Sequence, residues 1–115
     1  MALKKDVLAA CRSAGTDKPL DLVHLSSVTM GDRTLEKEIL SMFAAQIPGY
    51  LKLVREANQP SDVRKAAHTI KGSARSIGAF RLAELAKACE EKECFDLAVL
   101  ETEFRTVADY ISNLN

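Results

Sequence analysis

The apolar residues of this chain recur at intervals of three and four positions from one end to the other. That spacing places them on one face of an α-helix, whereas a half-buried β-strand needs alternating apolar and polar residues. Val, Ile and Thr are scattered through the chain and show no such alternation. The pattern therefore predicts an all-α protein.

Turn-forming residues divide this pattern into helical lengths. A short first helix is predicted over residues 4–13 and stops at Gly15. Pro19 then opens a second short segment, which ends at Gly31 and Asp32. The first long helix follows, and its apolar stripe consists of Leu35, Ile39, Leu40, Phe43, Ile47, Leu51 and Val54.

Three more helices are predicted after a break near Pro60, and a kink is expected at Pro48 within the helix before it. Ser61 is the expected N-cap of a helix that runs to about Ile77 and ends at Gly78. The apolar positions of the last two helices are Leu82, Leu85, Ala86 and Cys89, and then Leu97, Leu100, Phe104, Val107, Ile111 and Leu114. Four long helices with short connections predict an antiparallel, up-and-down four-helix bundle with one or two additional short N-terminal helices, in a single domain of residues 1–115.

Charge and hydropathy exclude several classes of function. The 16 basic and 16 acidic side chains cancel, which argues against nucleic acid or an anionic membrane surface as the main partner. No apolar run approaches the length needed to span a bilayer, and the N-terminus does not resemble a secretory or transit signal. We expect a cytoplasmic protein, and a monomer, since one chain supplies enough helices for a bundle.

The cysteines and one of the two histidines do not indicate a site. Cys11, Cys89 and Cys94 form no CxxC pair and no Cys/His cluster of the kind that binds zinc, so we expect reduced thiols. Cys89 lies on an apolar helical stripe and is interpreted as a small core residue. His24 has no ligand-like neighbours and is interpreted as a surface residue.

The helix that contains His68 has an unusual polar face. At about 100° per residue, a group of basic residues and a glycine lies within roughly 60° of this histidine. The group consists of Arg64, Lys65, Lys71, Gly72 and Arg75. The opposite face is apolar and consists of Val63, Ala66, Ile70, Ala74 and Ile77. His68 is therefore predicted to point to solvent at mid-helix.

This face predicts a site for a transferred phosphoryl group. Four like charges on neighbouring turns repel one another, which indicates that something anionic binds there. Gly72 costs a helix about 1 kcal/mol relative to alanine, and its missing side chain leaves an opening beside His68. A neutral imidazole has one ring nitrogen free to attack phosphorus, and Lys71 lies one turn along to offset phosphoryl charge.

The run AHTIKGSARSIGAFRLAELAKACE, residues 67–90, resembles the histidine-containing phosphotransfer (HPt) domains of multistep phosphorelays. The shared pattern is HxxKG, here His68, Lys71 and Gly72, followed by a helix-ending glycine at Gly78 and an apolar helix that starts with Leu82. The turn at Gly31 and Asp32 and the long helix that contains Phe43 and a proline also look like the family.

The resemblance implies a role for each matching residue. It implies that His68 accepts the phosphoryl group, that Lys71 assists electrostatically, and that Gly72 keeps the surface open. Glu90 occupies the position from which a Gln or Glu of the next helix often orients the imidazole; a surface acid without a role is the alternative. The implied partners are receiver domains, whose acidic pocket holds Mg²⁺.

The remaining basic residues have two readings. Arg64, Lys65 and Arg75 could form a solvated basic face, and we favour the reading that they contact the acidic receiver pocket. The chain itself has no Gly-rich phosphate loop, no kinase motifs and no carboxylate cluster for magnesium, so we expect no cofactor on it and no ATP-dependent activity of its own.

The sequence leaves two alternative functions. The phosphoacceptor and dimerisation domain of a sensor histidine kinase also carries a histidine on a helical bundle. Its helices usually place an acid directly after the histidine and a proline soon afterwards, whereas Thr69 and Ile70 follow His68 here. A helical adaptor that is never phosphorylated is the third reading, and the presence of His68 argues against it.

Overall fold

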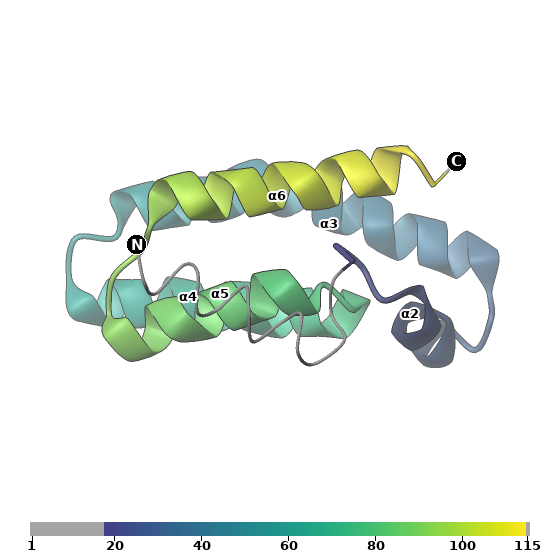
Figure 1. Ribbon diagram of the computed structural model, residues 1–115, viewed down its shortest axis with the longest axis horizontal. Helices are drawn as coiled ribbons and strands as arrows, with labels where there is room; N and C mark the ends of the chain where they lie inside the picture. The colour runs from purple at the N-terminus through teal and green to yellow at the C-terminus, as the bar shows by residue number, and fades with distance from the viewer. Residues whose placement is uncertain (1–17, 115) are drawn as a thin grey trace.

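The computed structural model describes residues 18–114, and the secondary structure within that range is entirely helical (Figure 1). This finding confirms the predicted all-α class for the described residues. The helices are α2 (Leu22–Thr29), α3 (Arg33–Glu56), α4 (Pro60–Ile77), α5 (Phe80–Lys92) and α6 (Leu97–Ser112). The helix predicted over residues 4–13 lies outside the described residues.

The first described helix begins later than its leading proline suggested. α2 starts at Leu22 because the side chain of Asp21 caps it, accepting hydrogen bonds from the backbone N–H groups of Val23 and His24. The predicted end at Gly31 and Asp32 is confirmed. Asp32 in turn caps α3, so two acidic caps position α2 and the start of α3.

The start of α3 agrees with the sequence prediction, whereas the start of α4 does not. α3 begins at Arg33 as expected and continues without interruption through Pro48 to Glu56. The prediction that Ser61 caps α4 is wrong, because Ser61 lies inside the helix and Gln59 is the capping residue, without a side-chain hydrogen bond. Pro60 explains the shift, since its fixed φ suits the first helical position and its nitrogen has no hydrogen to be capped.

Gly78 ends α4 as predicted and turns the chain directly into α5. Its φ of 84° is the left-handed conformation that glycine adopts without strain. Its carbonyl accepts a hydrogen bond of 2.8 Å from the backbone N–H of Asp21. A Cβ at this position would lie 2.7 Å from the carbonyl oxygen of Asp21. This turn therefore fixes α2 against the α4–α5 pair.

The long helices pack around a common apolar core. α3 and α6 lie along one side of the molecule, α4 and α5 along the other, and α2 lies across one end (Figure 1). Phe43, Tyr50 and Phe104 stack at the centre of the core, with ring centroids 5.8 to 6.5 Å apart. The hydroxyl groups of Tyr50 and of Ser73 on α4 are hydrogen-bonded at 2.9 Å, which ties α3 to the helix that carries His68.

Three predicted surface or core positions differ in the structure. Leu35 and Leu114, which the apolar stripes placed in the core, are each 39% exposed near the ends of their helices. His24 was interpreted as a surface residue, and this interpretation is wrong. Its ring is half-buried and packs edge-on against Phe80 at 5.1 Å between centroids, because α2 rests on the start of α5.

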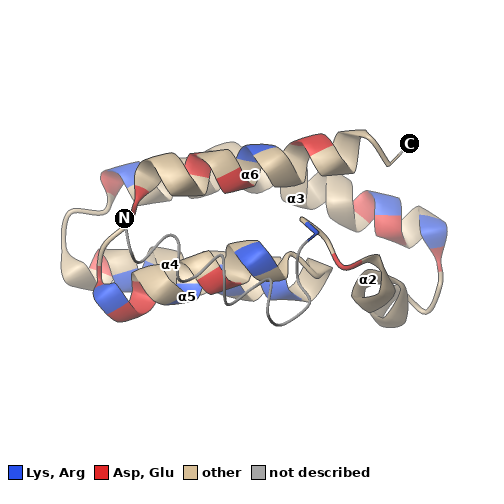
Figure 2. Cartoon of the chain, in the orientation of Figure 1, with Lys and Arg blue, Asp and Glu red and all other residues tan. Residues whose placement is uncertain are grey.

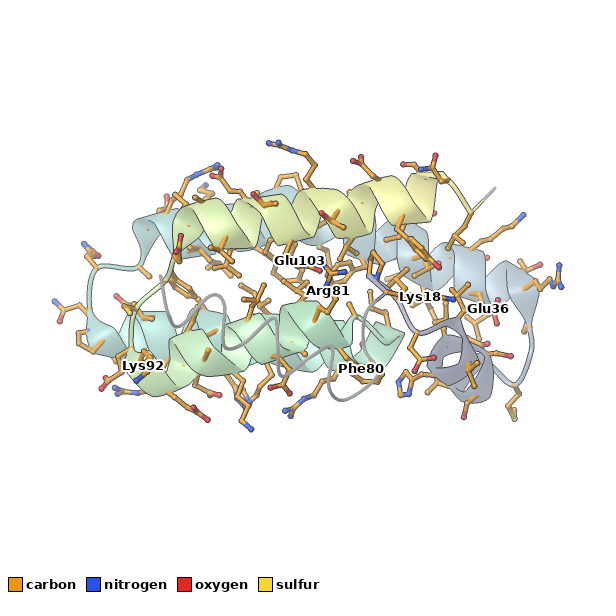
Figure 3. All side chains as sticks on the ribbon, in the orientation of Figure 1. Lys18, Glu36, Phe80, Arg81, Lys92 and Glu103 are labelled. Carbon is orange, nitrogen blue, oxygen red and sulfur yellow. The ribbon has the colours of Figure 1, made fainter. Side chains whose placement is uncertain are left out.

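One ion pair lies in the interior between α5 and α6. Arg81 and Glu103 point towards each other (Figure 3), with Nη2 of the arginine 2.9 Å from Oε1 of the glutamate. Burial raises the pKa of Glu103, and the charge of Arg81 opposes that rise. The pair ties the two helices together at a polar point within the apolar core.

Candidate functional site

The polar face of α4 carries the predicted acceptor. The His68 side chain is 72% exposed at the middle of the helix. The residues predicted for the opposite face, Val63, Ala66, Ile70, Ala74 and Ile77, are all buried. Ala67, beside His68 in sequence, is also buried, and these small side chains let α5 approach α4 closely. The predicted orientation of the helix is therefore confirmed.

The neighbouring helix α5 brings Glu90 into contact with this face. One carboxylate oxygen lies 3.1 Å from Nδ1 of His68, and the other accepts a hydrogen bond of 2.6 Å from the ammonium group of Lys71. The side chains of Lys71 and Glu90 are only 16% and 25% exposed, far less than that of His68. Glu90 thus bridges two groups that lie one turn apart on α4.

Glu90 is held in its charged form by these contacts. The hydrogen bond from Lys71 chiefly lowers the pKa of Glu90, and the hydrogen bond with His68 lowers it further. A carboxylate only accepts hydrogen bonds, so the neutral imidazole in this contact carries its proton on Nδ1. Nε2 then has a lone pair available for reaction on the exposed side of the ring.

Gly72 leaves the surface beside His68 open. A Cβ placed on this glycine would meet no atom within 4 Å, apart from its own helix backbone and chain neighbours. The glycine is therefore not required by packing inside this chain. The missing side chain leaves space for another molecule to approach the exposed imidazole.

The basic surroundings of His68 are more balanced than the helical projection indicated. The projection of α4 alone placed four cations around His68, whereas α5 supplies two acids, and acidic and basic residues lie side by side along α4 and α5 (Figure 2). Arg64 forms an ion pair with Glu93, as Lys71 does with Glu90. A pattern along α4 alone carries no signal for Glu93, because that residue lies on a different helix.

Lys65 and Arg75 are the other two predicted contact residues, and both are exposed. Lys65 borders a shallow groove with Thr69 and the exposed Leu53 of α3. Of the three residues predicted to bind the partner, Arg64 is therefore paired with an acid. Lys65 and Arg75 are exposed cations on the same side of α4 as His68.

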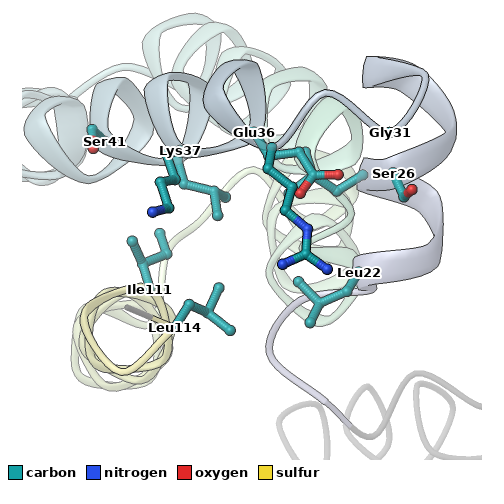
Figure 4. Close-up of a pocket in the computed structure, with 11 residues that line it drawn as sticks. Leu22, Ser26, Gly31, Glu36, Lys37, Ser41, Ile111 and Leu114 are labelled. Atoms are coloured by element: carbon teal, nitrogen blue, oxygen red, sulfur yellow. The ribbon is translucent and has the colours of Figure 1, made fainter.

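One groove in the described part of the chain lies away from this face. It encloses about 530 Å³ between α2, the first turns of α3 and the end of α6 (Figure 4). Leu22, Lys37 and Leu114 are among its lining residues, and it contains no residue of the predicted site. In residues 18–114, no three His, Cys, Asp or Glu side chains gather as metal ligands would. None of the helices in that range is long and apolar enough to cross a membrane.

The cysteines of the described range differ in environment. Cys89 is buried, as predicted, and burial raises the pKa of its thiol to about 11. Cys94 is exposed, and both thiols are free in the structure. Cys11 lies outside the described residues.

Comparison with known proteins agrees with the geometry of this face. The sequence model of the Hpt domain family matches residues 38–114, a range that includes α4, α5 and α6. Neither the curated proteins nor the solved structures contain a significant match. The matched range covers well over half of the chain and includes His68, Lys71, Gly72 and Glu90. The chain therefore belongs to the Hpt domain family, whose members act in phosphotransfer in phosphorelays.

Proposed function

We propose that this chain carries a phosphoryl group on His68 and exchanges it with aspartates of receiver domains, both of hybrid histidine kinases and of response regulators. The observation that carries the proposal is the bridge from Glu90 to His68 and Lys71 beside the open surface at Gly72. In this proposal residues 1–115 act as one domain, and α3 to α6 form its antiparallel up-and-down bundle.

The transfer step requires a nucleophile rather than a catalytic apparatus on this chain. The lone pair of His68 Nε2 attacks the phosphorus of an aspartyl phosphate, an N–P bond forms, and the P–O bond to the aspartate breaks. The aspartate leaves as a carboxylate. In the reverse direction a receiver aspartate attacks the phosphohistidine, and the imidazole leaves with its proton still on Nδ1.

Glu90 and Lys71 have complementary roles in this step. Glu90 holds the ring through Nδ1, which keeps Nε2 unprotonated and fixes its direction. Lys71 stands one turn from His68 and can offset the negative charge of the transferring phosphoryl oxygens. The positive charge of Lys71 also keeps Glu90 ionised, so the three residues act as a unit.

The partner supplies the remaining chemistry. We propose that the receiver domain brings the aspartate and an Mg²⁺ ion, that this chain binds no cofactor, and that it has no ATP site of its own. The exposed cations Lys65 and Arg75, with Arg64 at the edge, would attract the acidic receiver pocket and make association sensitive to salt. We further propose that the protein works in the cytoplasm as a monomer.

The test is a transfer assay with a receiver domain that carries labelled phosphate. Wild-type protein and His68→Gln are each incubated with the labelled receiver and magnesium, and label on this chain is measured over time. We expect label on the wild type and none on the variant, because glutamine lacks the nucleophilic ring nitrogen. Label on neither protein would contradict the carrier function, and label on His68→Gln would place the acceptor at another residue.

The same assay separates the alternatives. Labelling from ATP alone, with no receiver present, would identify a kinase phosphoacceptor domain instead. A chain that binds the receiver but never takes up label would be a helical adaptor. Circular dichroism of both proteins shows whether the substitution leaves the helices intact.

A further inference from the structure

The end of α5 brings two cysteines together. The helix stops at Glu93, which has a φ of 56° in the left-handed region. In this type of helix cap, the residue after the left-handed position donates its N–H to a carbonyl five residues earlier, and the two side chains are commonly in contact. Here the donor is Cys94 and the acceptor is the carbonyl of Cys89, at 3.3 Å.

Cys89 and Cys94 differ in exposure although their backbones lie close together. The Cys89 side chain is buried, whereas Cys94 is exposed. The hydrogen bond from Cys94 to Cys89 limits the separation of their Cα atoms to at most about 7 Å, close to the range that disulfides span. The helix end thus brings the backbones of the two cysteines within reach of a disulfide.

We propose that Cys89 and Cys94 form an intramolecular disulfide that slows phosphoryl transfer through His68. The ring closed by this bond contains Glu90, which contacts His68 and Lys71, and Glu93, which pairs with Arg64. The effect on transfer rests on the function proposed above, whereas formation of the bond does not.

The two thiols differ in the way that stepwise oxidation requires. The exposed Cys94, as a thiolate, attacks one sulfur of a low-molecular-weight disulfide such as oxidised glutathione and releases one thiol. The Cys89 thiol then loses its proton to solvent and attacks the Cys94 sulfur, displacing the second thiol. Two protein thiols are oxidised and one small disulfide is reduced to two thiols. Because burial raises the pKa of Cys89, Cys94 reacts first.

Bond formation must disturb the last turn of α5. Because Cys89 is buried and Cys94 is exposed, at least one of the two side chains has to move before the sulfurs can meet. Glu90 is the next residue in the chain, and its two contacts of 2.6 and 3.1 Å depend on the position of that turn. Small displacements of a positioning group reduce the rate of a transfer that depends on alignment.

Peptide mapping tests whether the disulfide forms. The full chain is equilibrated with oxidised glutathione, its remaining thiols are alkylated, and it is digested with trypsin without reduction. Cleavage after Lys87, Lys92 and Arg105 places Cys89 and Cys94 on separate peptides, residues 88–92 and 93–105. We expect these two peptides joined by a disulfide. Alkylated Cys89 and Cys94, or a lasting glutathione adduct on Cys94 alone, would overturn the proposal.

Transfer kinetics test the consequence of the bond. We expect oxidation to slow label uptake from a receiver domain by roughly threefold to tenfold, and dithiothreitol to restore the rate. Cys94→Ser should transfer at the reduced wild-type rate under both conditions. Cys11→Ser should respond like the wild type, which excludes the third cysteine. A joined peptide with an unchanged transfer rate would overturn the regulatory effect, whereas absence of label from reduced protein would contradict the proposed function instead.

Discussion

Glu90 connects two side chains that belong to another helix. Its carboxylate contacts Nδ1 of His68 and the ammonium group of Lys71, and these contacts lower its pKa. A lysine that is mostly covered and paired with an acid differs from a solvated surface cation, because its position is fixed before the partner arrives. In the proposed function, this difference favours a role for Lys71 in the chemistry of transfer and a role for Lys65, an exposed cation on the same face, in encounter with the partner.

Substitution of these two lysines separates the two roles. We expect Lys71→Ala to lower the transfer rate at saturating receiver by roughly tenfold or more, because charge compensation in the transition state is lost. Lys65→Ala should raise the receiver concentration needed for half-maximal rate and leave the saturating rate unchanged. The measurement is label uptake against receiver concentration. Equal effects of both substitutions on the saturating rate would remove the role assigned to Lys71.

Gly72 and Gly49 form a matched pair of helical glycines, each with open space where a Cβ would lie. Replacement of either with glutamine should raise the free energy of unfolding by about 0.5 kcal/mol, because glutamine favours helix over glycine. Only Gly72→Gln should slow transfer, by roughly tenfold, since its side chain fills the opening beside His68. Urea unfolding and the transfer assay measure the two effects. A Gly72→Gln protein that transfers normally would show that the opening has no role in access.

The turn between α4 and α5 sets the geometry on which the site depends. Gly78 combines a left-handed φ with a backbone contact to Asp21, and the helices that it joins carry His68 and Glu90. Gly31 also has a left-handed φ, of 78°, but a Cβ there would meet nothing within 4 Å. The two glycines therefore differ in packing and not in backbone conformation.

This difference predicts unequal costs for alanine at the two positions. Gly31→Ala should lower the free energy of unfolding by roughly 1–2 kcal/mol, the cost of a strained backbone alone. Gly78→Ala should cost about 3 kcal/mol or more, because its Cβ would also collide with the Asp21 carbonyl at 2.7 Å. Equilibrium unfolding in urea measures both values. Equal losses would mean that the Asp21 contact yields easily.

Helix positions followed from the sequence because apolar spacing and helix-ending glycines act locally. The pattern misplaced the start of a helix where two start signals lie close together. The cap of α2 is Asp21 and not a residue next to Pro19, and α4 begins at Pro60, before Ser61. The exposed face of α4 was predictable for the same local reason. Its charge balance was not, because Glu93 reaches Arg64 only through the register of α4 against α5. That register depends on tertiary packing, which a projection of one helix does not contain.

The charge of the whole chain is balanced, and the charge of the His68 face is partly balanced. The chain has as many acidic as basic side chains, and α5 places Glu90 and Glu93 against two of the four cations around His68. In the proposed function, a phosphoryl group on His68 adds negative charge near Lys71 and Glu90. The partly balanced face would then hold this group without a large permanent positive field that would attract nucleic acid.

The position of the phosphoryl group on the imidazole tests the central claim most directly. Because Glu90 contacts Nδ1, we predict that the N–P bond forms at Nε2 of His68. Protein labelled with ¹⁵N is phosphorylated by a receiver domain, and NMR of the imidazole nitrogens identifies the nitrogen that is coupled to phosphorus. Coupling at Nε2 of His68 is the predicted result. Phosphorus at Nδ1, or an unmodified His68 in a labelled protein, would contradict the account.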